Sequence, residues 1–382
     1  MFQAHRSPRV ACVLAAVLAG PLMAADCEQT GVGLTPISEL GATLYLDAFP
    51  GGLYPNGLNQ APAAHRLRGI TRAAAVEPRL PDGTPSADGH FVLLSIGMSN
   101  TTQEFCAGGA GGCAPYSFVG QALAHPAVET AHLVMVDGAA GGQTAGTWDS
   151  PKDSNYDRIR DDELAPLGLS ELQVQAVWVK VANSGPQTSL PAPNADAHQL
   201  VTQCGDIARA LRVRYPNVQV VFFSSRIYAG YASTALNPEP FAYESAFAVK
   251  WLVEAQIRQM AGLGIDARAG DLNSQTVAPW IGWGPYFWAD GLTPRADGLT
   301  WACTDYANDG THPSPSGREK VGTMLLDFML TSPFATPWFR ADGGPSGGDL
   351  TGDGTVGPAD LAILLAAWGP CGACDEDLDG NG

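Results

Sequence analysis

The stretch FVLLSIGMSN, residues 91–100, reads as a buried β-strand that ends abruptly in small and polar residues. A mostly apolar run leads into Gly97 and Met98, and the chain then turns polar at Ser99 and Asn100. In open α/β sheets, ligands and catalytic groups collect outside the carboxyl ends of the strands. We therefore expect Ser99 and Asn100 to face a functional site, where a reactive serine needs partners from elsewhere in the chain.

Three further valine-rich segments are predicted to be strands of the same sheet. They lack strict alternation of apolar and polar residues, which is typical of strands covered on both faces; they are residues 131–139, 174–183 and 218–228. Apolar residues recur at helical spacing in residues 196–215, 243–262 and 316–330. This alternation predicts an α/β fold with a mostly parallel sheet and helices on both faces.

Residues 1–25 have the pattern of a signal peptide. Basic residues precede the apolar run VACVLAAVLAGPLMAA, residues 10–25, and polar residues follow it. A buried N-terminal helix is the less favoured alternative. The run is short for a membrane span and no other stretch is long and apolar enough, so we expect a secreted, extracellular or periplasmic protein with no membrane span.

The composition predicts a large folded core with an acidic surface. Of the 382 residues, 45% are hydrophobic, which argues against bulk disorder. The net charge of −17 becomes −19 once Arg6 and Arg9 leave with the signal peptide. Such a surface repels phosphate backbones and anionic lipid, so nucleic acid is excluded as a favoured partner.

Turn residues and glycine-rich stretches divide the chain. Residues 26–89 contain many turns and are predicted to be an ordered extension packed on a core of residues 90–340. Residues 341–348, ADGGPSGG, read as a linker, and residues 349–382 as a short acidic module.

Export makes disulfide bonds possible, and seven of the eight cysteines remain after the signal peptide. Cys106 and Cys113 bracket the loop AGGAGG and are predicted to pair. The pairing of the other cysteines stays open, because connectivity cannot be deduced from spacing.

His312 and Asp309 are the predicted partners of Ser99. Nucleophilic catalysis by serine needs a base and a group that orients the base. Among the histidines only His312 has a carboxylate at suitable spacing, three residues earlier in NDGTHPSPSG, so one loop can present both side chains. The alternative interpretation is a turn at Asp309-Gly310 followed by a helix start.

An oxyanion in the transition state needs hydrogen-bond donors. The glycines after the second strand, in VDGAAGGQTAGTW, let backbone N–H groups approach a substrate, and Gly142 is the predicted donor. Asn183 ends the third strand in KVANSGP, and its side-chain amide is a second candidate. Each of these residues could instead serve turn structure alone.

The order Ser, Gly, Asn, Asp-x-x-His resembles the SGNH hydrolase superfamily of GDSL-type esterases. Gly97-Met98-Ser99-Asn100 is similar to the GxSN variant in sialate and acetylxylan esterase relatives, whereas Val-Ala-Asn183-Ser departs from the common Gly-x-Asn-Asp block. The resemblance implies a three-layer, flavodoxin-like catalytic domain over residues 90–340. It also implies ester hydrolysis by a Ser99–His312–Asp309 triad without a cofactor, with an oxyanion hole of Ser99, Gly142 and Asn183.

The substrate is less constrained by the sequence. The aromatic residues of 280–301, Trp288 among them, predict either a sugar-stacking wall or core packing. Arg226 and Tyr228 follow the fourth strand, and with Asn100 complete the expected substrate-binding set. Deacetylation of a carbohydrate is the favoured activity. A lipase or polyester hydrolase, or a non-catalytic, scaffold-anchored carbohydrate-binding protein, is the alternative.

The tail contains a predicted calcium loop. DLTGDGTVGPAD, residues 349–360, fits EF-hand spacing, with the expected ligands Asp349, Thr351, Asp353, Thr355 and Asp360. A second loop begins at Asp377, so the segment resembles a type I dockerin cut short at its second repeat. The resemblance implies bound Ca²⁺ and a cohesin or cell-surface scaffold as partner.

Overall fold

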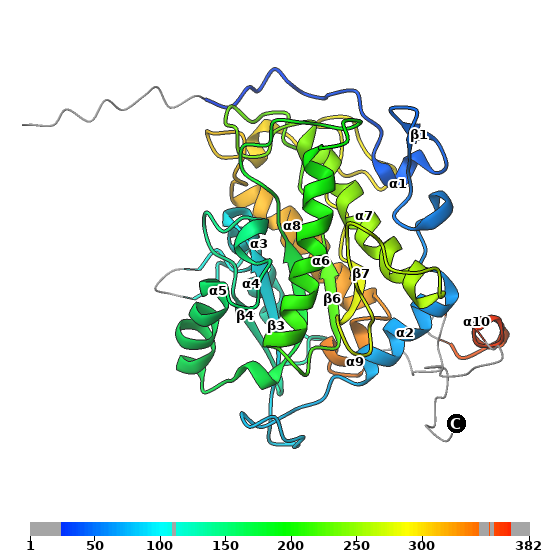
Figure 1. Cartoon of the computed structure of the whole chain (residues 1–382). Helices are drawn as coiled ribbons and strands as arrows, with labels where there is room; N and C mark the ends of the chain where they lie inside the picture. The colour runs from blue at the N-terminus through cyan, green and yellow to red at the C-terminus, as the bar shows by residue number, and fades with distance from the viewer. Residues whose placement is uncertain (1–23, 109–111, 344–350, 352–354, 368–382) are drawn as a thin grey trace, which may run out of the picture.

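The centre of the fold is one parallel sheet. The computed structural model describes residues 24–108, 112–343, 351 and 355–367 (Figure 1). Its five-stranded sheet comprises β3 (Phe91–Gly97), β4 (Leu133–Asp137), β5 (Val174–Lys180), β6 (Val220–Phe223) and β7 (Trp280–Trp283). Every neighbouring pair is parallel, and the spatial order is β4-β3-β5-β6-β7. The predicted α/β fold with a parallel sheet is therefore confirmed.

This strand order places a topological switch point between β3 and β5. In chain order the sheet reads 2-1-3-4-5, the flavodoxin-like arrangement, in which ligands bind where the direction of winding reverses. The register pairs Leu94 with Val177 and Gly97 with Lys180, so both strands end at the same level. Residues that follow β3 and β5 consequently lie side by side.

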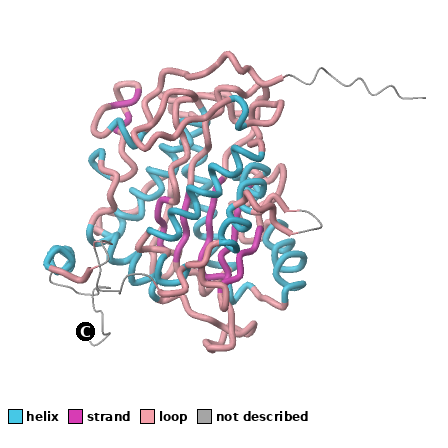
Figure 2. The backbone as a smooth tube through the Cα atoms, turned by 180° about the vertical axis from the view of Figure 1, so that it is seen from behind, coloured by secondary structure: helices cyan, strands magenta, loops and turns pink. Residues whose placement is uncertain are grey.

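Helices cover both faces of the sheet. Figure 1 shows α6 (Asp196–Arg214) and α7 (Phe241–Met260) on one face and α8 (Pro315–Thr331) on the other. The tube in Figure 2 shows the strands as a central layer between helices. Further α-helices besides the short α1 are α2 (Ala63–Ala74), α3 (Ser99–Phe105), α4 (Phe118–Ala124), α5 (Ser154–Arg158), α9 (Thr336–Phe339) and α10 (Pro358–Ala367).

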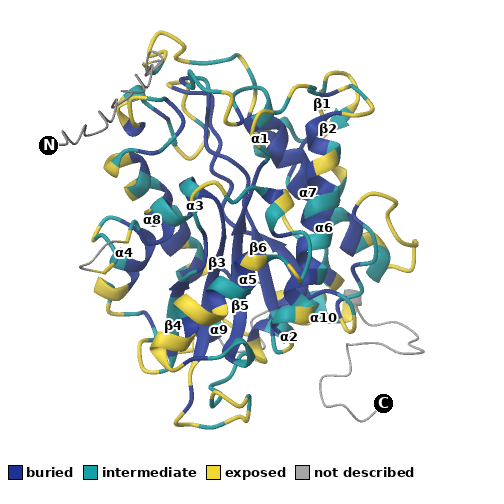
Figure 3. Cartoon of the chain, turned by 60° about the vertical axis from the view of Figure 1, so that its left-hand side comes forward, coloured by how far each residue is buried: buried dark blue, intermediate teal, exposed yellow. Residues whose placement is uncertain are grey.

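Burial on both faces explains the composition of the strands. All residues of β3, β5, β6 and β7 are buried, and Figure 3 shows these strands as the buried centre of the molecule. A strand with no solvent face needs no polar alternation, so valine and other apolar residues fill it. The four predicted strands and three predicted helices correspond to β3–β6 and to α6–α8.

Several shorter elements were not predicted from the sequence, and two of them, β7 and α2, contribute to the core. Strand β7 lies within the aromatic segment that was interpreted as a sugar-stacking wall or core packing, and only four residues, WIGW, pair with β6. Helix α2 lies within residues 26–89, where Leu67, Ile70 and Ala73 form one buried stripe. The stripe is three apolar residues long, which made it a weak periodic signal among the surrounding turns.

The rest of residues 26–89 is tied to the core by polar contacts. The short helix α1 (Ile37–Leu40) and the two-stranded hairpin of β1 (Leu44–Tyr45) and β2 (Phe49–Pro50) precede α2. Asp290, after β7, accepts hydrogen bonds from the backbone N–H groups of Val32 and Gly33, at 2.6 and 2.9 Å.

Two disulfides are present in the described residues. Cys106 and Cys113 are joined, as predicted, and Cys27 is joined to Cys303, 276 residues away in sequence. Cys204 is a buried free thiol on α6. The long-range disulfide fastens the start of the described chain beside the loop that carries Asp309 and His312.

Several predictions lie at or beyond the limits of the described residues. Residues 1–23 of the predicted signal peptide, most of the linker at 341–348 and most of the acidic module lie outside them. Within the part of the chain that the structure describes, no helix combines the length and hydrophobicity needed to cross a bilayer.

The buried carboxyl group of Glu244 predicts a pH dependence of stability. It accepts hydrogen bonds from the Tyr45 hydroxyl and the Leu190 N–H, yet burial raises its pKa from 4.5 to about 7. Because the folded state then holds a proton that the unfolded state releases, this group's contribution falls as pH rises from about 4.5 to 7. Over that window we expect wild type to lose up to about 3 kcal/mol of unfolding free energy relative to Glu244→Gln.

Urea unfolding of both proteins at several pH values measures this difference. The exposed Asp327 supplies the matched control, Asp327→Asn. A wild-type minus Glu244→Gln difference that stays constant between pH 4.5 and 7 would contradict the prediction.

Candidate active site

Ser99 stands at the junction of β3 and α3. The strand ends at Gly97, and Ser99 is the first residue of the helix, so its backbone N–H has no acceptor within the helix. Gly97 is required by crowding, since a Cβ there would collide with the Thr101 side chain and the Lys180 carbonyl. The sharp strand-to-helix turn therefore carries the serine hydroxyl at the carboxyl edge of the sheet.

The Ser99 hydroxyl meets the His312 imidazole. Their Oγ and Nε2 atoms are 2.8 Å apart, although the residues are 213 positions apart in sequence. On the other side of the ring, Nδ1 lies 2.5 Å from Oδ2 of Asp309. When the Nδ1–H group donates its hydrogen bond to Asp309, the neutral ring has a lone pair at Nε2 that can accept the serine proton. The three predicted residues are thus linked by two hydrogen bonds, from Ser99 to His312 and from His312 to Asp309.

A tight turn holds Asp309 and His312 together. Oδ1 of Asp309 accepts the backbone N–H groups of Thr311 and His312, both at 3.0 Å, while Oδ2 binds the ring. Gly310 takes a φ of +64°, and a Cβ there would meet the Tyr231 backbone. The same carboxylate therefore shapes the turn and orients the base.

Opposing effects act on the Asp309 carboxyl group. Partial burial pushes its pKa upward, but the hydrogen bonds from the His312 ring and from the backbone of His312 and Thr311 outweigh that and lower the pKa. Asp309 is consequently a carboxylate at neutral pH. This charge state lets it accept the hydrogen bond from the Nδ1–H group of His312.

Asn100 ties the two halves of the site together. Its Nδ2 donates to the Thr311 carbonyl at 3.1 Å, and the side chain is buried. The Thr311 hydroxyl in turn pairs with that of Thr234 at 2.8 Å. Asn100 was predicted to bind substrate; it lines the cavity described below, and its amide links the nucleophile helix to the histidine loop.

A buried ion pair anchors α3 to the sheet. Lys180, the last residue of β5, places Nζ 2.6 and 2.5 Å from the two carboxylate oxygens of Glu104 on α3, and both side chains are fully buried. Thr101 also donates to the Lys180 carbonyl at 2.6 Å. The sequence reasoning missed this pair, although a lysine inside the apolar run VQAVWVKVAN was a signal that a buried carboxylate faces it.

The glycine loop after β4 lies against the nucleophile. The Ala140 N–H donates to the Gly97 carbonyl at 3.1 Å, and a Cβ on Gly141 would touch the Ser99 Cβ. Gly142, at a φ of +78°, lines the same cavity as Ser99. The structure therefore brings the predicted Gly142 to the serine.

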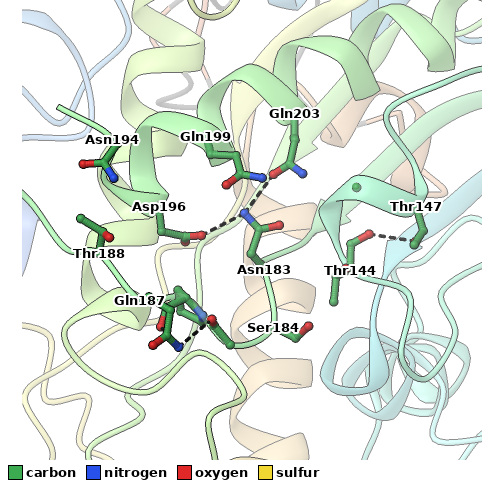
Figure 4. Close-up of a pocket in the computed structure, with 13 residues that line it drawn as sticks. Thr144, Thr147, Asn183, Ser184, Gln187, Thr188, Asn194, Asp196, Gln199 and Gln203 are labelled. Carbon is green, nitrogen blue, oxygen red and sulfur yellow. Dashed lines mark hydrogen bonds between the residues drawn. The ribbon is translucent and has the colours of Figure 1, made fainter. Parts of the chain in front are cut away.

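Asn183 corrects one prediction. Its Nδ2 donates to Oδ1 of Asp196 and to Oε1 of Gln203, both at 3.0 Å, and Figure 4 shows the side chain directed toward these two groups on α6. An amide nitrogen has two protons. Both are taken in this arrangement, so the predicted donation from Asn183 to an oxyanion is wrong for this conformation.

A cavity of about 350 Å³ opens over Ser99 and His312. Besides those two it is lined by Met98, Asn100, Gly142, Thr144, Asn183, Ser184, Arg226, Leu236, Asn237 and Thr311. A second cavity of about 460 Å³ shares Thr144, Asn183 and Ser184 with it (Figure 4). Amide, hydroxyl and carboxylate groups dominate the second wall: Thr147, Gln187, Thr188, Asn194, Asp196, Gln199 and Gln203.

The other predicted substrate contacts divide into two groups. Arg226 lines the catalytic cavity. Tyr228 and Trp288 do not: both are buried in the core, where Tyr228 donates to the Gln29 carbonyl at 2.8 Å and Trp288 to Glu239 at 2.7 Å. Their assignment as substrate contacts was wrong, because the polar tips of these rings are used inside the fold.

The tryptophans of 280–301 likewise belong to the core and form no stacking wall. Trp280, Trp283, Trp288 and Trp301 are all buried, so the core-packing alternative of the sequence analysis holds.

The calcium-loop prediction is described in part. Asp360 Oδ1 accepts the Thr351 N–H and Oδ2 the Gly357 N–H, both at 2.7 Å, so residue 12 of the predicted loop folds back on residue 3. Two of the five predicted calcium ligands, Asp349 and Asp353, lie outside the described residues. Calcium binding by these two residues together with Thr351, Thr355 and Asp360 therefore stays a prediction.

Comparisons with known proteins returned fold-level similarities. No family model and no curated protein matches the chain. A candidate GDSL-like lipase from Parabacteroides merdae is 10% identical with a TM-score of 0.35, covering 66% of this chain and 97% of its own. A candidate acylhydrolase from Bacteroides fragilis is 11% identical with a TM-score of 0.32, covering 71% and 98%.

A third solved structure is a salicylyl-acyltransferase, SsfX3, from a tetracycline biosynthetic pathway. It is 15% identical with a TM-score of 0.33, covering 66% of this chain and 58% of its own. Similarities this low do not carry an activity to this chain.

Breaking the buried ion pair is expected to destabilise the protein. Lys180→Met leaves the Glu104 carboxylate buried and unpaired, which costs about 3–5 kcal/mol of unfolding free energy. The double variant Lys180→Met/Glu104→Leu removes both charges and should recover most of that loss. Urea denaturation measures the unfolding free energy of both variants. If Lys180→Met is as stable as wild type, the buried ion pair does not stabilise the fold as assigned here.

Proposed function

We propose that the protein is a serine esterase that hydrolyses carboxylic esters through Ser99, His312 and Asp309. The observation that carries the proposal is the hydrogen-bonded series from Ser99 Oγ to His312 Nε2, at 2.8 Å, and from Nδ1 to Asp309, at 2.5 Å. Nucleophile, base and orienting carboxylate in this order are the minimum that acyl transfer to a serine requires. The adjoining cavity supplies space for an ester.

In the proposed reaction His312 takes the Ser99 proton as Oγ attacks the ester carbonyl carbon. The tetrahedral oxyanion is stabilised by the backbone N–H groups of Ser99 and Gly142. The C–O bond to the alcohol then breaks, and the imidazolium returns the proton to the leaving alkoxide. A water molecule, deprotonated by His312, attacks the acyl-enzyme and releases the carboxylic acid and free Ser99. Asp309 stabilises the imidazolium in both halves.

The polar second cavity favours a hydroxyl-rich alcohol component. It opens beside the catalytic cavity and offers amides and hydroxyls that match the donors and acceptors of a sugar. A lipase or polyester hydrolase would need an apolar groove there. We therefore keep carbohydrate deacetylation, on an acetylated polysaccharide for example, as the favoured activity of a secreted enzyme, and the two disulfides fit an oxidising compartment.

Removal of the nucleophile tests the reaction. Ser99→Ala is expected to lower kcat on 4-nitrophenyl acetate by about 10³-fold or more, because the residual groups cannot form an acyl-enzyme. The control is Ser86→Ala, in the loop before β3. A fluorophosphonate probe should label wild type at Ser99. Unlabelled protein without esterase activity would favour the non-catalytic carbohydrate-binding alternative and refute the proposal.

A substitution in the second cavity tests the carbohydrate component. Gln199→Ala is expected to lower kcat/KM on acetylated xylan by about 3- to 10-fold, the effect of one hydrogen bond, with little change on 4-nitrophenyl acetate. Thr202→Ala, on the same helix but outside the cavity lining, is the matched control. Equal losses on both substrates would argue that the cavity does not hold the sugar; faster hydrolysis of tributyrin than of acetylated xylan would favour the lipase alternative.

A further inference from the structure

Arg226 is an unpartnered cation in the wall of the catalytic cavity. The residue is 2% exposed, and its Nε and Nη2 atoms are buried without a hydrogen-bond partner in the part of the chain that the structure describes. Its backbone N–H donates to Ser245 Oγ at 3.1 Å, which holds the chain in place beyond the end of β6. Leaving buried guanidinium donors unsatisfied is costly, and native proteins keep such groups where a ligand completes them.

Among the described residues, no carboxylate is hydrogen-bonded to the Arg226 side chain or forms an ion pair with it. The groups that act on it electrostatically are the carboxyl groups of Glu104, Glu239 and Asp309 and the phenol of Tyr306, whose hydroxyl donates to the Tyr228 carbonyl. Glu104 is paired with Lys180, and Asp309 is hydrogen-bonded to His312. Glu239 accepts the Trp288 indole N–H at 2.7 Å and two backbone N–H groups at 2.9 Å. Within the described residues none of the three forms an ion pair with Arg226, whose pKa burial lowers.

We propose that Arg226 binds a carboxylate group of the substrate, so that the preferred ester carries a negative charge close to its scissile bond. The proposal deepens the esterase function above and rests on it. A planar guanidinium matches a carboxylate in geometry and charge, and the pair is strong where water is excluded. A cavity of about 350 Å³ has room for an ester group and a further substituent.

The acidic surface does not prevent this recognition. The chain carries a net charge of −17, which repels an anion at long range. At physiological ionic strength the Debye length is about 8 Å, so that repulsion is largely screened, whereas a buried contact is screened much less. Assays at or above about 0.15 M salt therefore isolate the contribution of Arg226.

The carboxylate can belong to either half of the ester, and two substrate pairs distinguish the halves. For the acyl half, monoethyl succinate is compared with ethyl 4-methylpentanoate, in which an isopropyl group replaces the carboxylate. For the alcohol half, an acetylated methyl glucuronoside is compared with the corresponding acetylated methyl glucoside. Release of acid is followed by pH-stat, and the ratio of kcat/KM within each pair is the measured quantity.

We expect wild type to prefer the carboxylate-bearing ester by about 10- to 100-fold in one of the two pairs, the effect of one charged hydrogen-bonded contact. Arg226→Gln should bring that ratio close to one, and Arg226→Lys should restore part of it. Arg268→Gln, which removes the same charge from an exposed site, is expected to keep the wild-type ratio.

The outcomes that overturn the inference are separate from those that overturn the esterase. If wild type hydrolyses the neutral ester at least as fast in both pairs, or if Arg226→Gln keeps the wild-type preference, Arg226 does not recognise a carboxylate and the esterase proposal stands. If no ester is hydrolysed and Ser99 is not labelled, the esterase proposal itself fails. If Arg226→Gln does not fold, the inference is tested by the kcat/KM ratios of wild type and of Arg226→Lys. A wild-type ratio near one in both pairs, or an unchanged ratio in Arg226→Lys, then overturns it.

Discussion

The parallel sheet is the constraint on which the rest of the structure depends. Because all five strands run in the same direction, the segments that follow them collect at one edge. The order β4-β3-β5-β6-β7 puts the ends of β3 and β5 next to each other, and the serine, glycine and asparagine segments follow β3, β4 and β5. His312 reaches the same edge on the loop before α8, where it meets Ser99 at 2.8 Å.

Positioning at this edge depends on buried polar contacts. The Lys180–Glu104 pair and the Thr101 hydrogen bond hold α3 against β5, Asn100 links α3 to Thr311, and Asp309 closes its own turn. Buried polar groups are costly unless they are satisfied, so a fully satisfied network favours one geometry over looser alternatives. Ser99 on α3 and His312 on its loop are therefore each held in position by their own set of hydrogen bonds. This preorganisation is what acyl transfer at a serine requires.

Polar satisfaction also distinguishes residues that build the site from residues that remain available to a ligand. Asn183, Tyr228 and Trp288 donate to protein acceptors, whereas Nε and Nη2 of Arg226 have no acceptor among the described residues. Residue type and proximity in sequence could not separate these cases. All four follow strands β5, β6 or β7; Asn183 was predicted to bind the oxyanion, and the other three were predicted to contact the substrate.

The amino-acid sequence by itself determined the fold class and the catalytic candidates. Buried valine-rich strands and amphipathic helices carry their signal locally, and so does an Asp-x-x-His spacing within one loop, which is why β3–β6, α6–α8, Ser99, Asp309 and His312 could be predicted. Only the tertiary structure decided the partners of Lys180, Asn183 and Arg226 and the pairing of Cys27 with Cys303. Those depend on contacts between residues far apart along the chain, and a hydrogen bond given to one neighbour is no longer available to another.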